Sequence, residues 1–201
     1  MKKFGIFVIK PDAINKHDLS IIQETLNKYG FSKSICFNID NYCELMRKYR
    51  EADIRFKNLD NAEIEITCCN VALSAYQQLF IKDNALLLLV PLGKESFKDF
   101  FDKANFAKRE IRKQIEEDRG YYYAYIDYRT SPRLVKLTHE EYKIRKNKDK
   151  TDINKAYING IHLEDYECFE SNFCLNFMVE NGIIGKSNKV DINELIENLE
   201  V

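Results

Sequence analysis

The sequence predicts an α+β fold, in which strands and helices are mixed along the chain. Continuous apolar runs at residues 4–9 and 85–90 are typical of strands that are buried on both faces. The segments between them have apolar residues at helical spacing, and two strand-like runs at 121–128 and 133–137 indicate a hairpin. The order strand, helix, strand, helices, strand, helices, hairpin, strand and helix is consistent with an α+β sandwich.

The first strand is followed by a helix signal. Asp18 can cap this helix, and Gly30 can end it. Alternating residues from Phe31 to Ile39 then predict the second strand, and Asp40 is expected to start a second helix. The apolar stripes of the two helices are expected at Leu19, Ile22, Leu26 and Tyr29, and at Tyr42, Leu45, Met46 and Tyr49.

The middle of the chain contains one more long helix and the most apolar strand. Residues 62–80 have helical spacing, and the run at 85–90 is expected at the centre of the sheet. Gly93 should turn the chain into short helices. The first of these would contain Phe97, Phe100 and Phe101, and the second Ala107, Ile111 and Ile115.

A Tyr-rich hairpin is expected from residue 121, with residues 130–132 as its turn. Thr138 to Glu141 resembles the start of a short helix. The basic run at 143–150 lies next to the tyrosines and could bind RNA. One such patch on a chain of net charge −1 favours a solvated loop instead. We therefore do not expect a nucleic acid as partner.

The end of the chain is predicted to contain a strand and two helices. The strand-like run from Tyr157 contains His162, which lies just before Asp165. Asp165 can cap a helix that ends at Gly182. Phe169, Phe173 and Phe177 form the stripe of that helix and are expected in the core. A last helix at about 191–200 starts with Asp191 and Glu194 in capping-box spacing, and should dock on the body or on a second subunit.

The composition bounds the class of protein. The chain has 201 residues, of which 45% are apolar and 31% charged, as in an ordinary soluble domain. The longest apolar run, at 85–92, is far too short to span a membrane, and we expect no signal peptide because Met1-Lys2-Lys3 leads straight into a strand. We expect a cytoplasmic protein without a membrane partner. Its six cysteines lack metal-binding spacing, so no metal site is predicted on the protein.

His162 is the main candidate for chemistry. Imidazole has an ordinary pKa of about 6.5, so it can exchange protons or attack an electrophile near neutral pH. Free N–H groups at a helix start beside Asp165 would suit a phosphate. Lys10 is a second candidate, because it emerges at the end of a buried strand and Pro11 fixes the chain direction there. A hydrogen-bonded structural histidine and a surface lysine are the simpler alternatives.

These residues together resemble the nucleoside diphosphate kinase family. The resemblance lies in Lys10-Pro11-Asp12 at the end of the first strand, in Asn159 and His162 at Asn-x-x-His spacing, and in Glu110-Ile111-Arg112 between them. It covers residues 3–118 and 156–182 in pieces, so it implies a single domain over residues 1–201 with an insertion at about 119–155. The implied fold is a ferredoxin-like, four-stranded antiparallel sheet with helices on one face, to which the hairpin is added.

The resemblance also implies an activity. His162 would take the γ-phosphate of a nucleoside triphosphate as phosphohistidine and pass it to a nucleoside diphosphate or related acceptor. Lys10 and Arg112 would hold phosphates, Asn159 would hold the sugar or phosphate end, and Tyr49 would lie beside the histidine. A core tyrosine of its helix is an equal alternative for Tyr49. Mg²⁺ would enter with the nucleotide, and a homo-oligomer is implied.

The sequence departs from the family pattern at several positions. An arginine and a threonine before Glu110-Ile111-Arg112 have no counterpart at alignable spacing, although Lys98, Lys103, Lys108 and Arg109 lie there. The glutamate that orients the family's histidine falls at Phe173, so Glu164, Glu167 or Glu170 would have to replace it. Two alternatives stay open: a nucleotide-binding regulatory or scaffolding module without efficient turnover, and a kinase with a changed acceptor.

Overall fold

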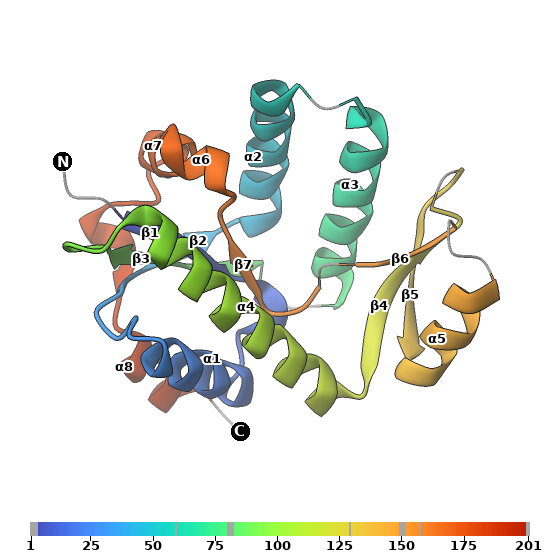
Figure 1. Ribbon diagram of the computed structural model, residues 1–201, viewed down its shortest axis with the longest axis horizontal. Coiled ribbons are helices and arrows are strands. Elements are labelled where there is room, and N and C mark those ends of the chain that lie inside the picture. The colour runs from blue at the N-terminus through green and yellow to red at the C-terminus, as the bar shows by residue number, and fades with distance from the viewer. Residues whose placement is uncertain are drawn as a thin grey trace. The chain divides into compact units, whose positions relative to one another are not determined.

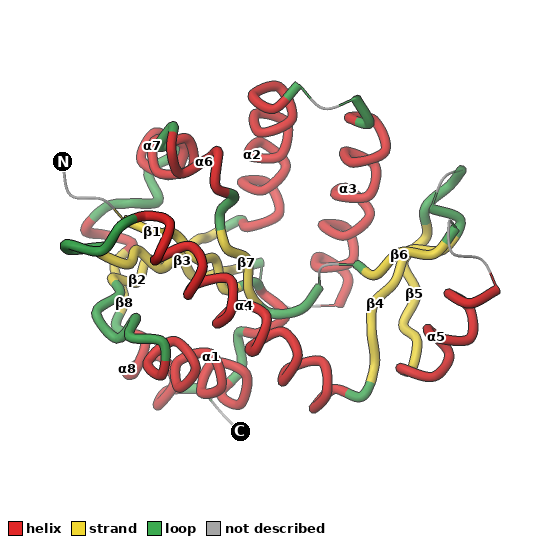
Figure 2. Tube along the Cα trace, viewed as in Figure 1, coloured by secondary structure: helices red, strands yellow, loops and turns green. Residues whose placement is uncertain are grey.

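A computed structural model describes residues 4–58, 60–79, 83–128, 130–148, 152–156 and 158–199. These residues form two compact units. The first comprises Met1–Asp40, Asn84–Ile115 and Asn159–Val201, and the second comprises Asn41–Asp83 and Glu116–Ile158. The sequence predicted a single domain with an insertion at about 119–155; the second unit contains that segment, within Glu116–Ile158, and also residues 41–83. Figure 1 labels helices and strands of both units, and β8 is labelled in Figure 2.

The first unit is built on one antiparallel sheet, which confirms the α+β class (Figure 2). Its strand order is β7-β1-β3-β2-β8. The strands are β1 (Phe4–Ile9), β2 (Ile35–Asp40), β3 (Asn84–Pro91), β7 (Ile161–Leu163) and β8 (Lys189–Val190). β3 lies at the centre, as predicted from its apolar run. The sheet has five strands where four were predicted, because β8 pairs with β2 at Cys36 and Phe37.

Three helices cover one face of this sheet: α1 (Lys16–Lys28), α4 (Phe97–Arg119) and α8 (Ile192–Asn198). The core on this face includes Phe7, Ile9, Leu88, Phe100 and Ile111. α4 is one helix of 23 residues, so the prediction of two short helices was wrong. Its last turn, from Glu116, belongs to the second unit. α8 confirms the predicted C-terminal helix, and the Asp191 carboxylate accepts a hydrogen bond from the backbone N–H of Asn193.

Two predicted helix starts were wrong. Asn15, not Asp18, caps α1: its side chain accepts from the Asp18 N–H at 2.9 Å, which places Asp18 inside the first turn. Asp40 is the last residue of β2, and α2 (Tyr42–Lys57) begins after Asn41, whose backbone is left-handed with φ 55°.

The predicted helix from Asp165 to Gly182 is split in two. α6 (Tyr166–Glu170) and α7 (Phe173–Glu180) are separated by Asn172, whose φ of 53° cannot continue a helix. Cys174 and Met178 are therefore the buried residues of α7, whereas Phe173 and Phe177 are only half-buried. The side chain of Phe169 lies outside the described part of the chain. The 3-10 turn η2 (Lys186–Asn188) leads into β8.

The second unit contains a helical pair and the predicted hairpin. α2 and α3 (Ala62–Leu79) are joined by residues 58–61. β4 (Tyr121–Ile126) pairs antiparallel with β5 (Arg133–Thr138), and β6 (Ile153–Lys155) pairs with the other edge of β4. Ala124, Leu137 and Ile153 form a small core, and the Tyr125 hydroxyl donates to the Cys68 carbonyl of α3 at 2.8 Å. The hairpin is thus packed onto α3.

The basic run after the hairpin is helical, so the prediction of a loop was wrong for its described residues. α5 (His139–Lys148) includes Lys143 to Lys148, and residues 149 and 150 lie outside the described residues. Thr138 and Glu141 cap this helix reciprocally: the Glu141 carboxylate accepts from the Thr138 N–H at 2.7 Å, and the Thr138 hydroxyl accepts from the Glu141 N–H at 3.2 Å. In the part of the chain that the structure describes, no helix is long and apolar enough to cross a membrane.

Candidate functional site

β1 and β7 bring Lys10 and His162 to the same region of the first unit. Val8 pairs with His162 and Ile9 with Ile161, and the Lys10 N–H donates to the Gly160 carbonyl at 2.8 Å. Side chains alternate between the faces of a strand. Because Ile9 and Ile161 point into the core under α1 and α4, Lys10 and His162 lie on the other face. Two residues far apart in the sequence are therefore neighbours.

A tight turn before β7 fixes Asn159 beside Lys10. The Lys10 ammonium donates to Asn159 Oδ1 at 3.4 Å, and both residues are buried. The Gly160 N–H donates to the Asp12 carboxylate at 2.9 Å, and Gly160 has a φ of +84°. Asp12 belongs to the 3-10 turn η1 (Pro11–Ala13), which begins at Pro11 directly after the strand. The Lys-Pro-Asp segment thus holds the turn that precedes His162.

Arg112 reaches the same strand from α4. Its Nε and Nη2 atoms donate to the Ile161 carbonyl at 2.9 and 2.7 Å. β7 is the edge strand of its sheet, so Arg112 binds the outer edge of the strand that carries His162. Lys108 lies one turn earlier on α4 and is half-buried. Burial, followed by the charge of Arg112, lowers the pKa of Lys108.

The surroundings of His162 disfavour its protonated form. Burial lowers the pKa of this imidazole to about 3, and the charges of Lys10, Arg112 and Lys108 act in the same direction. Asp165 is the acidic group that opposes them. At neutral pH His162 is therefore uncharged, with a nitrogen lone pair available, and the charges of three cations act on it. This is an arrangement that favours an anion next to the imidazole.

The adjacent Glu164 is bound to β1. Its Oε1 atom accepts from the Ile6 N–H at 3.0 Å, and its own N–H donates to the Ile6 carbonyl at 3.2 Å. Burial raises the pKa of this carboxyl to about 8. Glu167 and Glu170, the other two candidates for orienting His162, are exposed on α6. The hydrogen bond of the Glu164 side chain is therefore made to the backbone of β1 and not to the imidazole of His162.

Tyr49 is the predicted site residue that belongs to the other unit. It is half-buried on α2, and the site residues above all lie in the first unit. Its predicted position beside His162 stays a prediction.

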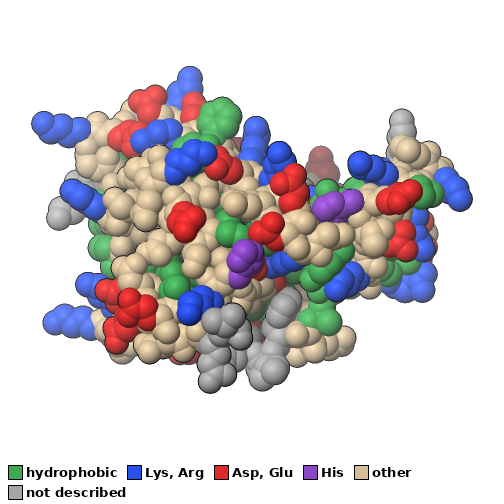
Figure 3. Space-filling view, turned by 90° about the horizontal axis from the view of Figure 1, so that it is seen from below, with side chains coloured by type: hydrophobic (Ala, Val, Ile, Leu, Met, Phe, Trp, Pro, Cys, Tyr) green, Lys and Arg blue, Asp and Glu red, His purple; other side chains and the backbone are tan. Residues whose placement is uncertain are grey.

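No protein-family model, curated protein or solved structure matches this chain. The function is therefore argued from the site itself. Figure 3 shows basic and acidic side chains interspersed over one face of the molecule, in agreement with a net charge of −1. Attraction to an anion must therefore be local, and the charges that act on His162 are one local group of cations.

Lys108 is the site residue that the sequence prediction missed. It was noted among four basic residues without a defined position, and the helix that carries it was predicted in two pieces. In the continuous α4, Lys108 and Arg112 are four residues apart and share a face. That i, i+4 spacing was the available signal. Glu110, aligned with the family motif, instead bonds Lys28 at 2.7 Å and the Tyr29 hydroxyl at 2.9 Å.

Proposed function

We propose that this protein is a phosphotransferase that moves the γ-phosphate of a nucleoside triphosphate through a phosphohistidine at His162 to a nucleoside diphosphate or related acceptor. The observation that carries the proposal is the set of three cations, Lys10, Lys108 and Arg112, whose charges act on a neutral histidine. Phosphoryl transfer needs fixed positive charge around a positioned nucleophile; the three cations would supply the charge, and His162 would be the nucleophile.

The sheet of the first unit supports the proposal. Without its fifth strand, the order is β7-β1-β3-β2 with antiparallel neighbours, and α1 and α4 cover one face. The resemblance to the nucleoside diphosphate kinase family implies a four-stranded antiparallel ferredoxin-like sheet with helices on one face, and these four strands are compatible with it. Many activities share such a fold, so the site and not the sheet supports the chemistry.

In the proposed reaction, a ring nitrogen of His162 attacks the γ-phosphorus. A nitrogen–phosphorus bond forms, the bond to the β-phosphate oxygen breaks, and the nucleoside diphosphate leaves with that electron pair. The terminal phosphate oxygen of the acceptor then attacks the same phosphorus and restores the neutral imidazole. Lys10, Lys108 and Arg112 would stabilise the charge on the equatorial oxygens in both steps.

The side chains around His162 do not fit a protein-held metal ion. Asp165 is accompanied there by three cations, and the described residues contain no group of three His, Cys, Asp or Glu side chains that could hold a metal. We therefore assign the Mg²⁺ of the proposed reaction to the nucleotide phosphates, which would carry it into the site.

The test is a steady-state assay of phosphate transfer from Mg²⁺-ATP to a panel of nucleoside diphosphates. A shared phosphoenzyme predicts parallel double-reciprocal lines when both substrates are varied. His162→Ala should abolish transfer, whereas His17→Ala, which changes an exposed histidine of the same unit, should leave it unchanged. Intersecting lines, or full activity of His162→Ala, would contradict the proposal.

A second candidate function is a nucleotide-binding regulatory module without turnover. Two sets of hydrogen bonds favour it. The Arg112 Nε and Nη2 atoms already donate to the Ile161 carbonyl, and the Glu164 carboxyl already accepts from the backbone of β1, so these atoms are already bound within the protein. This alternative predicts saturable ATP binding that depends on Lys10 and Lys108, with no transfer to any acceptor. Equilibrium binding measured beside the kinetic assay separates the two candidates.

A further inference from the structure

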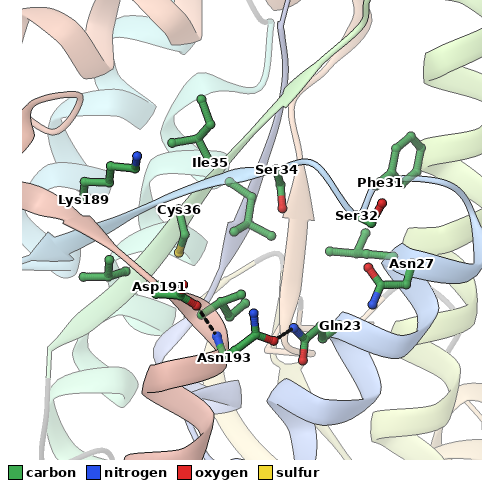
Figure 4. A pocket seen from close by; sticks show the side chains of 14 residues that line it. Gln23, Asn27, Phe31, Ser32, Ser34, Ile35, Cys36, Lys189, Asp191 and Asn193 are labelled. Atoms are coloured by element: carbon green, nitrogen blue, oxygen red, sulfur yellow. Dashed lines mark hydrogen bonds between the residues drawn. The ribbon is translucent and has the colours of Figure 1, made fainter.

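The first unit has a concave site at the edge of its sheet opposite to β7. It is a pocket of about 490 Å³ between α1, the start of β2, and the segment from β8 into α8. β7 and β8 are the two outer strands of the sheet, so none of the residues around His162 lines this pocket. Figure 4 shows side chains of these elements around the space.

The short β8 explains why the space is open. β8 pairs with β2 only at Cys36 and Phe37, so the edge of β2 before Cys36 faces the pocket and not a strand. α8 begins two residues after the end of this pairing and forms the next part of the wall. The Gln23 amide donates to Asn193 Oδ1 and joins α1 to α8 across one side.

The lining combines an apolar floor with a polar, nearly uncharged rim. The apolar floor consists of aliphatic, aromatic and thiol groups: Leu26, Phe31, Ile35, Cys36, Leu88, Val190 and Ile192. The rim presents amides and hydroxyls from Gln23, Asn27, Asn193, Ser32 and Ser34. Its charged residues, Lys189 and Asp191, are of opposite sign, and the Asp191 carboxylate already accepts from the Asn193 N–H at 2.9 Å.

The thiol in the floor is a neutral group. Burial, followed by the charge of Asp191, raises the pKa of Cys36 to about 12. A thiol with such a pKa is not a nucleophile at neutral pH, so the pocket is suited to reversible binding rather than covalent chemistry.

From this lining we infer that the pocket binds an uncharged heterocyclic molecule of the nucleobase or nucleoside class. Its volume lies within the range of small-molecule sites. Side-chain amides offer both a donor and an acceptor, which match the carbonyl and amino edges of a base, and the apolar floor suits a ring face. A polyol would leave the floor unmatched, and a phosphate would find no excess of positive charge. The inference is independent of the function proposed for His162.

The experiment uses tryptophan fluorescence, because the chain contains no tryptophan. Lys189→Trp places a reporter on the rim, and Lys186→Trp is the matched control on the same segment outside the lining. Neutral nucleosides and bases, nucleoside monophosphates and glucose are titrated against each protein. We expect the fluorescence of Lys189→Trp to change saturably with nucleosides or bases. The same change should occur when His162→Ala is added, and the fluorescence of Lys186→Trp should not change.

A filling variant provides the second readout. Ser34→Trp introduces a large side chain at a half-buried lining position and should weaken nucleoside binding to the otherwise unchanged protein at least tenfold by calorimetry. Ser74→Trp, at an exposed position on α3, should bind like the natural sequence. The inference is overturned if no neutral base or nucleoside binds at millimolar concentration, if glucose or only phosphorylated ligands bind, or if Ser34→Trp and Ser74→Trp bind equally.

Discussion

At the scale of single residues, the proposed chemistry would depend on the charges that act on one imidazole. Lys10 is fixed by the strand pairing and by Asn159, and Arg112 is fixed by the Ile161 carbonyl. Such cations are already in place before a substrate arrives, so their electrostatic stabilisation of a transition state costs little reorganisation. Lys108 extends the same surface along α4.

We therefore expect Lys10→Ala, Lys108→Ala and Arg112→Ala each to lower phosphotransfer by about 10²–10³-fold, the scale for the loss of one preorganised charge-stabilising contact. The measurement is kcat for transfer from ATP to a nucleoside diphosphate at saturation, with circular dichroism to verify folding. Lys113→Ala is the control, because Lys113 is exposed on the same helix. An unchanged kcat for Lys108→Ala would remove that residue from the site.

Glu164 makes stability depend on pH. Its pKa is raised to about 8 in the folded protein, so folding is favoured by the protonated form, and this contribution is lost as pH rises from about 4.5 through 8. Glu164→Gln cannot ionise. The free energy of unfolding of both proteins is measured in urea at each pH. The value for Glu164→Gln minus the value for the natural sequence should increase by about 3 kcal/mol between pH 5 and pH 8.

His162 titrates in the opposite sense and does not disturb that comparison. Its pKa is lowered to about 3, so its contribution to stability is lost as pH falls below about 6.5, in both proteins alike. A difference between Glu164→Gln and the natural sequence that stays constant from pH 5 to pH 8 would mean that the folded carboxyl titrates normally.

At the scale of elements, the turn before β7 determines where His162 stands. Gly160 has a left-handed backbone, and a Cβ there would lie 2.5 Å from Ile115 Cδ1 and 3.3 Å from the Ala13 side chain. The turn therefore combines a conformational and a packing requirement for glycine. It also aligns Asn159 with Lys10 through the bond from the Gly160 N–H to Asp12.

Gly160→Ala should destabilise the protein by about 2–4 kcal/mol, since it adds overpacking to the cost of the left-handed backbone. Gly120→Ala is the matched control, because Gly120 has a φ of +70° but a Cβ added there would meet no neighbouring atom within 4 Å. It should cost only about 1–2 kcal/mol. Equal losses in chemical denaturation would show that the contact with Ile115 relaxes freely.

The elements that the sequence predicted well are those with a strong apolar period. β1, β3, α1 and the β4–β5 hairpin follow from such patterns and from turn residues. β8 escaped prediction because two residues carry no period, and the break between α6 and α7 depends on a single left-handed asparagine. α4 could have been predicted as one helix, since Phe100, Ala104, Ala107, Ile111 and Ile115 recur at spacings of three and four.

The candidate site was only partly visible in the sequence. Lys10, Asn159 and His162 stand at strand ends, where a pattern indicates them, and Arg112 came from the family resemblance. Lys108 needed a continuous α4, and the commitment of Glu164 to Ile6 needed the register of β7 against β1. The spacing of residues along the sequence does not show which distant segments pair with one another.

At the scale of the whole molecule, the segment around 119–155 is attached by ends that lie close together. The Arg119 guanidinium donates to the Ile158 carbonyl at 3.5 Å, and Lys155 pairs with Glu116. A short linker can therefore replace the hairpin and α5, while the residues proposed to act on phosphate all lie in the first unit.

Replacement of residues 121–150 by a Gly-Ser linker should leave a folded protein that still accepts phosphate on His162 but differs in acceptor preference or oligomer size. The measurements are a panel of nucleoside diphosphates and light scattering. Tyr125→Phe, which keeps the hairpin but removes its bond to Cys68, serves as a milder control. An unchanged acceptor profile together with an unchanged mass would make the segment a passive surface addition.

The most direct test of the central claim is the phosphoenzyme itself. The protein is incubated with Mg²⁺ and ATP labelled at the γ-phosphate, and the site of labelling is mapped in the natural sequence and in His162→Ala. We predict one acid-labile, base-stable phosphate on His162 that a nucleoside diphosphate removes, and none in the variant. Absence of label at high ATP, or the same label in His162→Ala, would contradict the account.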